Sequence, residues 1–235
     1  MLNPELRAIT NKIRNNELHK KTLNILENLT FEFGGESYTG LSIDEAPAGL
    51  SHHHAYPGGY LEHIVSSTSI ALALCESVEK VYCGKVNRDL VIAGMLLHDH
   101  FKLVSYLTSK KGGYENSLLA DRLDHLSLAI SELVRRDFPL ELIHVVAAHH
   151  GNHGPVSPRT LEALICHLAD SADSQLNGNM MSAASFLTRK ASSEEFLVEN
   201  AKEAFEIVHS KSLKGWKGVL CAMKRIKRQR ETRKT

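Results

Sequence analysis

Histidines and aspartates that could hold metal ions are concentrated in the middle of this chain. Fourteen of its 235 residues are histidine, and most of them lie between residues 52 and 167. The candidates for metal chemistry are, in chain order, His63, His98, Asp99, His125, His149, His150 and Asp170. Imidazole nitrogens together with carboxylate oxygens suit divalent transition metals. Taken singly, a helical histidine is more often a hydrogen-bonded or surface residue, so only the whole pattern supports a metal centre.

The pair His98 and Asp99 directly follows the apolar run LVIAGMLL at residues 90–97. A carboxylate at the end of a buried helix is destabilising unless it is paired or bound to a cation. A metal ion would supply that cation. Lys102 is three residues away on the same helical face, so a plain ion pair would serve equally well. Both interpretations of Asp99 stay open at this point.

His149 and His150 precede a glycine that is expected to end a helix, with the two rings about 100° apart around its axis. Two adjacent neutral imidazoles favour a transition metal over calcium or magnesium, which prefer oxygen ligands. Further along, Asp170 shares a helical face with His167 and with Asp173. Neighbouring buried carboxylates repel each other unless cations lie between them.

The elements that must position these residues are predicted to be helices. Apolar residues recur at helical spacing through most of the chain, whereas the alternation typical of strands is rare, which predicts an all-α fold. The expected helices cover residues 4–29, 60–82, 90–97, 117–136, 139–150, 159–176, 194–209 and 213–230. Residues 30–59 are irregular and rich in glycine, and a short hairpin fits there. Side chains spread over so many helices can meet only in a bundle around one centre.

Composition bounds the class of protein. Hydrophobic residues make up 43% of the chain, no apolar run is long enough to span a membrane, and the first residues lack the apolar core of a signal peptide. We therefore expect a single cytoplasmic domain over 1–235. Four scattered cysteines without a C-x-x-C pair indicate reduced thiols, and Cys75, Cys166 and Cys221 fit core positions.

The C-terminal segment is strongly basic. Residues 211–235 hold ten Lys or Arg and one Glu, while the other 210 residues hold 18 basic and 26 acidic side chains. This segment could meet nucleic acid, an acidic partner or the acidic body of its own chain. Trp216 among lysines could stack on a base. The apolar spacing over 213–223 favours instead an amphipathic helix that faces the core.

The series H…HD…H…HH…D resembles the HD-domain superfamily of metal-dependent phosphohydrolases, in its two-metal form. The stretches SHHHAYPGGYLEH (51–63) and HHGNHGPVSPRTLEALICHLAD (149–170) resemble the HD domain of the YhaM-type 3′-5′ exoribonucleases. The resemblance covers about residues 50–178 and implies an all-α HD-domain helical bundle, here with additional N- and C-terminal helices. Two features depart from the pattern. HDHFK stands where HD-x-GK is usual, and 50 mostly helical residues cannot supply the N-terminal oligonucleotide-binding barrel of those exoribonucleases.

The resemblance implies a role for each matching residue. One metal would be held by His63, His98, Asp99 and Asp170, and a second by Asp99, His125, His149 and His150. Lys102 occupies the place of the family's lysine and would contact the substrate phosphate beside the catalytic Asp99. His54 of the histidine triplet and His100 are expected to touch substrate. The two metals would be manganese, iron, cobalt or nickel, among which the ligand set does not discriminate.

The implied activity is that of a two-metal phosphodiesterase for a nucleotide or short oligonucleotide, with a metal-bridging hydroxide as nucleophile. One alternative is a nucleoside monophosphate phosphatase. Its one-metal relatives need only H…HD…D, so His125 and the pair His149 and His150 favour phosphodiesters. The other alternative is a non-catalytic metal-containing protein that binds nucleic acid or an acidic partner through the basic C-terminus, with no membrane partner.

Overall fold

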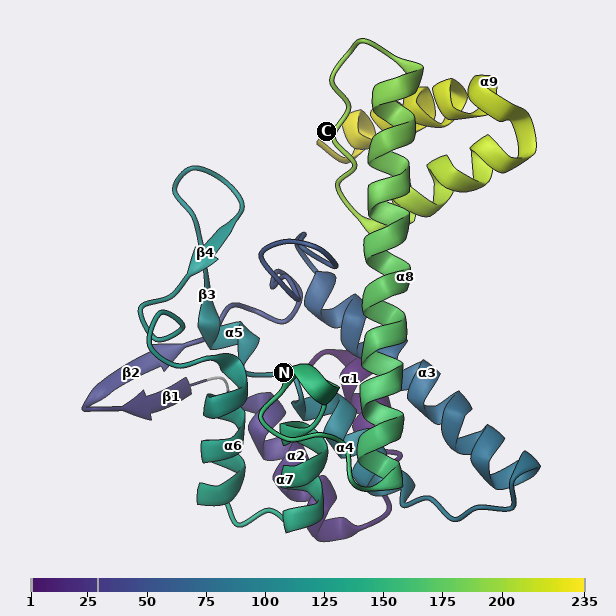
Figure 1. The fold of residues 1–235 in the computed structure, drawn as a ribbon. Coiled ribbons are helices and arrows are strands. Elements are labelled where there is room, and N and C mark those ends of the chain that lie inside the picture. The colour runs from purple at the N-terminus through teal and green to yellow at the C-terminus, as the bar shows by residue number, and fades with distance from the viewer. Residues whose placement is uncertain (1, 29, 235) are drawn as a thin grey trace.

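The computed structural model describes residues 2–28 and 30–234, and helices dominate this part of the chain (Figure 1). The longer helices are α2 (Asn16–Glu27), α3 (Gly59–Val81), α4 (Arg88–Leu97), α6 (His125–Arg135), α7 (Leu140–Ala147), α8 (Leu161–Ala191) and α9 (Ala201–Lys234). The shorter ones are α1 (Pro4–Thr10), α5 (Lys102–Ser105) and the 3-10 turn η1 (Gly151–His153). The predicted all-α fold is confirmed.

The described residues also form two small antiparallel hairpins. Strand β1 (Thr30–Phe33) pairs with β2 (Glu36–Thr39), and β3 (Tyr106–Thr108) pairs with β4 (Tyr114–Asn116). The first lies within the segment for which the sequence allowed a hairpin. The second was not predicted, and it is followed by turns rather than by the helix expected from residue 117.

Helix α4 forms the centre of the body. Residues Val91–Leu97 are buried, and they contribute to two apolar clusters, one shared with α1, α2, α6 and α7 and the other with α3, α7 and α8. The contact with α7 is close, since a Cβ on Gly94 would lie 2.4 Å from a methyl carbon of Val145. The apolar part of α4, Val91–Leu97, is therefore buried on every side, as its composition predicted.

Local sequence sets where the helices that carry the site begin. Asp124 caps α6, because its carboxylate accepts a hydrogen bond from the backbone N–H of Ser127 at 2.6 Å. The cap places His125 at the first position of the helix, whereas periodicity alone predicted a start near residue 117. Thr160 caps α8 in the same way, through the backbone N–H of Ala163.

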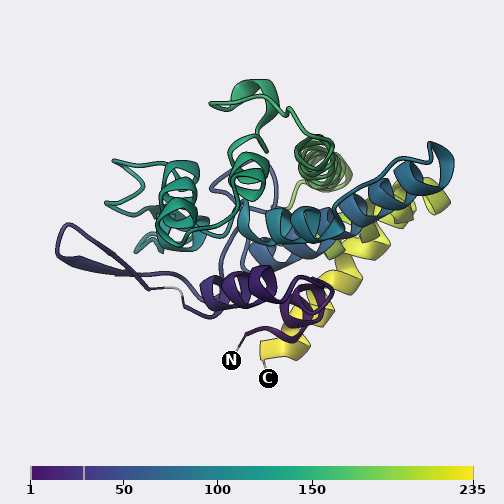
Figure 2. The ribbon, with the colours of Figure 1, turned by 90° about the horizontal axis from the view of Figure 1, so that it is seen from below.

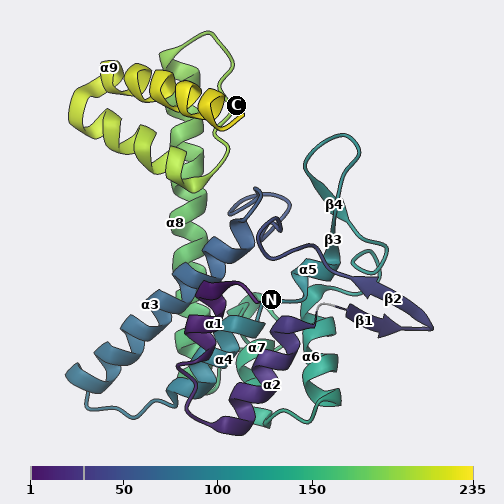
Figure 3. The same ribbon diagram turned by 180° about the vertical axis from the view of Figure 1, so that it is seen from behind.

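Helix α8 extends well beyond the body, as Figure 1 shows, and is seen nearly end-on in Figure 2. Its upper half packs against α9, which bends at Gly215 and folds back on itself (Figure 3). A separate apolar cluster, with Phe196, Ile207 and Val219 among its members, forms the core of this C-terminal extension. The description of residues 1–235 as a single domain stays a prediction.

The basic C-terminal segment pairs with acidic residues of its own chain. Arg225 binds Glu206 at 2.7 Å, and Arg230 binds Glu203 at 2.9 Å between Nε and Oε1. Lys227 binds Glu194 at 2.8 Å. Pairing with the acidic body of its own chain was one of the three alternatives for this segment, and the acidic residues paired here lie instead in the C-terminal extension. A nucleic-acid or acidic partner finds no support.

Two predictions about this extension need correction. Cys221 is exposed, because it lies on the outer side of α9, whereas Cys75 and Cys166 are buried as predicted. The amphipathic stripe is only partly right, since Val219 is buried but Trp216 remains 48% exposed. Among the described residues, no helix is long and apolar enough to cross a membrane.

Candidate metal centre

The predicted ligands come together where five helices meet. His63 lies on the second turn of α3, and His98 and Asp99 directly follow α4. His125 begins α6, while His149 and His150 follow the end of α7. Asp170 is in the third turn of α8. All seven residues are brought to one place, which is what the bundle argument required.

The first group of ligand atoms lies between α3, the end of α4 and α8. His63 Nε2 is 3.2 Å from His98 Nε2 and 3.3 Å from Asp170 Oδ1. The other ring nitrogens are already used: His98 Nδ1–H donates to the Met95 carbonyl oxygen at 2.9 Å, and His63 Nδ1 lies 2.7 Å from Asp173. With both Nδ1 atoms protonated, both Nε2 atoms carry lone pairs that face each other and a carboxylate. Either a metal ion between these atoms or a proton on one Nε2 satisfies such an arrangement.

The second group lies on the other side of Asp99. The nitrogens of His125, His149 and His150 include atoms that lie within 4.8 Å of one another. Asp99 Oδ1 is 3.3 Å from His125 Nε2 and 3.7 Å from His149 Nε2. All three of these atoms are buried and have no hydrogen-bond partner. Orphaned buried polar atoms are rare, and a lone-pair cluster of this kind fits a metal ion.

Asp99 stands between the two groups. Its Oδ2 is 3.3 Å from His63 Nε2 and 3.5 Å from His98 Nε2, while its Oδ1 faces the second group. Burial opposes ionisation of this carboxyl, but Lys102 and His98 hold its pKa well below the usual range. An ionised carboxylate that directs one oxygen to each group is suited to bridge two cations.

Lys102 also makes the ion pair that the sequence allowed. Its ammonium lies 2.6 Å from Asp99 Oδ2, and its residue is only 9% exposed. Burial lowers the pKa of this lysine, but Asp99 more than offsets that effect and the pKa is raised. The ion pair occupies Oδ2 only. It therefore leaves Oδ1 unsatisfied, and the two interpretations of Asp99 are compatible.

The protonation states differ between the two groups, and those of the second group suit metal ligation. Burial, with His98 nearby, lowers the pKa of His149 to about 3, and burial together with His125 lowers that of His150. Both rings are neutral near pH 7. Burial also disfavours a charged His63, but Asp170 and the other carboxylates around it raise its pKa well above the usual range. Without a metal, His63 supplies the positive charge of the first group.

The two histidines predicted to contact substrate are differently placed. His100 is buried, its Nδ1 lies 2.9 Å from the Tyr60 hydroxyl, and it borders a small cavity with Ile25 and Phe31. This position does not support the substrate contact expected for His100, which stays a prediction, because the ring lies beside α2 and the first hairpin. His54 is only 3% exposed, and its backbone N–H donates to Asn177 at 2.8 Å. It therefore forms a wall of the site rather than an open contact.

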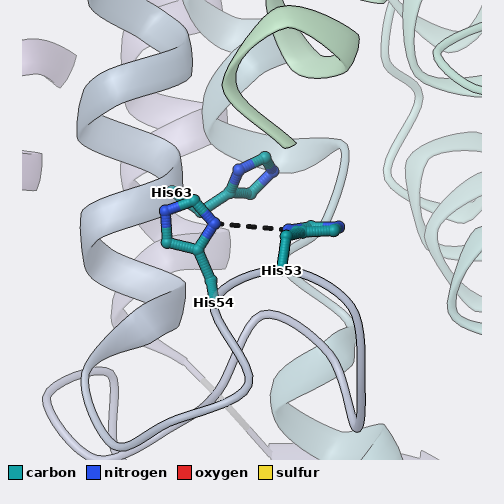
Figure 4. Close-up of side chains that lie close together, drawn as sticks. All are labelled: His53, His54 and His63. Atoms are coloured by element: carbon teal, nitrogen blue, oxygen red, sulfur yellow. Dashed lines mark hydrogen bonds between the residues drawn. The ribbon is translucent and has the colours of Figure 1, made fainter. Parts of the chain in front are cut away.

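His53, not His54, is the triplet residue at the open side of the cluster. Its ring centroid is 5.3 Å from that of His63, and its Nδ1 is 3.3 Å from His54 Nδ1 (Figure 4). The loop that carries it is tightly held, with positive φ at His52 and His54. Gly59 allows this geometry, since a Cβ there would lie 2.1 Å from the His54 carbonyl oxygen. Strained backbone that is fixed by its surroundings is typical of functional loops.

Two further residues near the cluster were not assigned a role from the sequence. Asp173 contacts His63, and the shared helical face of Asp170 and Asp173 was the signal that pointed to it. Tyr106, at the start of β3, lies near Lys102 and Asp99. Burial raises the pKa of its hydroxyl, and Lys102 offsets only part of that effect. No pattern in the sequence indicated Tyr106, because the hairpin that places it was not predicted.

Comparison with known proteins gives a family and two kinds of relative. The HD domain family model matches residues 60–175. A dihydroneopterin 2′,3′-cyclic phosphate phosphodiesterase of Methanocaldococcus jannaschii is 45% identical over 169 residues, 72% of this chain and 68% of that protein. The 3′-5′ exoribonuclease YhaM of Listeria monocytogenes is 33% identical over 142 residues, 56% of this chain and 43% of that protein. No solved structure matches.

Proposed function

Because the chain belongs to the HD-domain family of metal-dependent phosphohydrolases, we propose that it opens a small cyclic phosphodiester, of the ribose 2′,3′-cyclic phosphate type, with two metal ions. One observation carries the proposal: Asp99 directs Oδ2 towards one group of ligand atoms and Oδ1 towards another, whose orphaned nitrogens have no other partner. A relative that covers most of this chain is named for a cyclic phosphodiester, which supports the substrate class.

The chain's own residues define where the ions would be held. The first site would use His63, His98, Asp99 and Asp170, and the second Asp99, His125, His149 and His150. Manganese, iron, cobalt and nickel all fit mixed imidazole and carboxylate ligands. When bound, such ions lower the pKa of water and offset negative charge on phosphoryl oxygens, which is the chemistry that diester hydrolysis requires.

Lys102 would stabilise the transition state directly. One of its three N–H donors is held by Asp99, which fixes the position of the ammonium and leaves two donors for phosphoryl oxygens. Because the lysine is buried, its charge acts in a medium of low dielectric constant and needs little rearrangement during reaction. Its expected role is to bind the oxygens on which charge accumulates.

His53 would contact the substrate from the loop over the site. Its ring is partly exposed, and its Nε2 points away from His54 (Figure 4). Burial, with the charges of His63 and Lys102, lowers the pKa of His53 to about 4, so the ring is neutral near pH 7. This assignment replaces the predicted contact of His54, which is enclosed.

A short oligonucleotide is the second candidate substrate, favoured by the similarity to the YhaM exoribonucleases. Two observations place it second. The chain spans less than half of the length of those relatives. The described residues before α3 form two helices and a two-stranded hairpin, not a barrel that could bind an oligonucleotide. A monoester phosphatase ranks lower, because it would leave the second ligand group without a purpose.

A substrate panel tests the proposal. Protein loaded with Mn²⁺ would be offered 2′,3′-cyclic nucleotides, dihydroneopterin 2′,3′-cyclic phosphate, nucleoside monophosphates and short RNA. We expect cyclic diesters to give monophosphates, with no release of inorganic phosphate, and Asp99→Ala to lose both bound metal and hydrolysis. Hydrolysis of monoesters alone would refute the proposed diesterase activity. Preference for RNA would promote the second candidate.

A further inference from the structure

A buried carboxylate outside the proposed ligand sets lies directly behind the first of them. Asp173 is 3% exposed, and its Oδ2 lies 2.7 Å from His63 Nδ1. The same oxygen is 3.7 Å from His54 Nε2. Asp173 lies almost one turn after Asp170 on α8, so one helix supplies both a proposed ligand and the group that contacts a second ligand from behind. Ser66 next to this carboxylate helps to lower the pKa of Asp173.

The contact with His63 determines which of its nitrogens is free. A carboxylate accepts only, so the 2.7 Å contact requires a proton on Nδ1. The neutral ring then has its lone pair on Nε2, which is the atom that faces His98 and Asp170. If the proton moved to Nε2, the ring would present an N–H where a ligand needs a lone pair. An outer carboxylate also fixes the ring orientation and increases the basicity of the ligating nitrogen.

The same oxygen orients a second imidazole and, through it, a third. With Asp173 nearby, a proton on His54 Nε2 is favourable and a lone pair there is not. His54 Nδ1 then carries the lone pair and accepts a hydrogen bond from His53 Nδ1–H at 3.3 Å (Figure 4). His53 is left with its lone pair on Nε2, the nitrogen that faces away from His54. The backbone of His54 is held independently by Asn177.

We propose that Asp173 is the positioning residue of this site: one buried oxygen sets the tautomers of His63 and, through His54, of His53. The metal ligand and the substrate loop are thereby oriented by the same group. The role rests on the proposed function of His63 as a ligand. It predicts that loss of Asp173 weakens metal binding and also changes the nitrogen that His53 offers to a substrate hydroxyl or water.

The test uses the full chain with Asp173→Asn and Asp173→Ala, and Glu162→Gln as the control. Glu162 is also on α8 and its carboxylate accepts a hydrogen bond from the Asn87 backbone N–H at 2.8 Å, but it belongs to neither ligand group. Co²⁺ affinity is measured by competition with a chelator. Ring nitrogen chemical shifts of the Zn²⁺-loaded protein report the histidine tautomers.

We expect Asp173→Ala to weaken Co²⁺ binding at one of the two sites by about 10- to 100-fold, while binding at the other site changes less. Asp173→Asn is expected to fold like the wild type and to lose affinity by a smaller factor, with altered ring shifts for His63 and His53. Affinities within twofold of wild type and unchanged ring shifts in Asp173→Asn would overturn the role. A wild-type protein that binds no Co²⁺ would instead overturn the proposed function itself.

Discussion

Substitution of Lys102 by Met separates the two interpretations of Asp99 that the sequence left open. Lys102 and Asp99 form a buried pair at 2.6 Å, and removing one member of such a pair destabilises a protein by about 3–5 kcal/mol. We expect that full loss in the metal-free protein. In the metal-loaded protein the ions beside Asp99 compensate the carboxylate, so the loss should be clearly smaller. Folding and metal binding form a thermodynamic cycle, so a smaller loss in the metal-loaded protein means that the variant should bind metal at least as tightly as the wild type.

Activity is expected to fall in this variant, even though metal binding is at least as tight as in the wild type. Without the buried ammonium, hydrolysis of a cyclic phosphodiester should fall by about 10²- to 10³-fold, the usual effect of removing one donor from a charged transition state. Urea denaturation with and without Mn²⁺, followed by kinetics at saturating Mn²⁺, measures all three quantities. An equal loss of stability in both states would refute the reasoning, because it would mean that Lys102 alone satisfies Asp99.

Three other predictions follow from the geometry. His149→Ala should lower the bound metal from two ions to one, as measured by elemental analysis after desalting, since only the second ligand group loses a member. Gly59→Ala should destabilise the protein and reduce activity, because its Cβ would lie 2.1 Å from the His54 carbonyl oxygen; thermal unfolding and kinetics would detect both. Burial lowers the pKa of His54 and His149 to about 3, while unfolded imidazoles titrate near about 6.5. Below pH 6.5 the unfolded state therefore takes up protons that these two folded rings do not. Their contribution to metal-free stability should be full above that pH and fall towards pH 4 by up to about 1.4 kcal/mol per pH unit for each ring. Urea denaturation across this range would contradict the assignment if stability stayed constant.

The positions of the proposed ligands could be predicted because their signal is local. His98 and Asp99 follow an apolar helix, and His149 and His150 precede a glycine, so each residue was placed at a helix end before any packing was known. The ligand roles themselves came from the resemblance to a family and remain to be measured.

The parts that the sequence could not supply depend on packing between distant segments. Helical spacing placed Asp173 on the same face as Asp170, but it does not encode the contact of Asp173 with His63, which lies 110 positions away in the chain. His53 and His54 are adjacent and chemically identical, and only the loop geometry decides which one is enclosed. His100 was expected at the site because it follows Asp99 directly, whereas the chain places its ring beside Ile25 of α2.

The helix boundaries show the same limit. Apolar spacing over 117–136 predicted one helix, but the Asp124 cap delays α6 and the preceding residues form turns beside the second hairpin. Helix α8 continues to Ala191, fifteen residues past its predicted end, because α9 packs along its second half and buries that surface. Tertiary contacts overrode the local pattern in both places.

Anomalous diffraction from crystals of the protein loaded with Mn²⁺ tests most directly whether two ions share Asp99. Two anomalous peaks are predicted, one among His63, His98 and Asp170 and the other among His125, His149 and His150, with a carboxylate oxygen of Asp99 facing each. A single peak in the first group, with the second group hydrogen-bonded to water, would contradict the account.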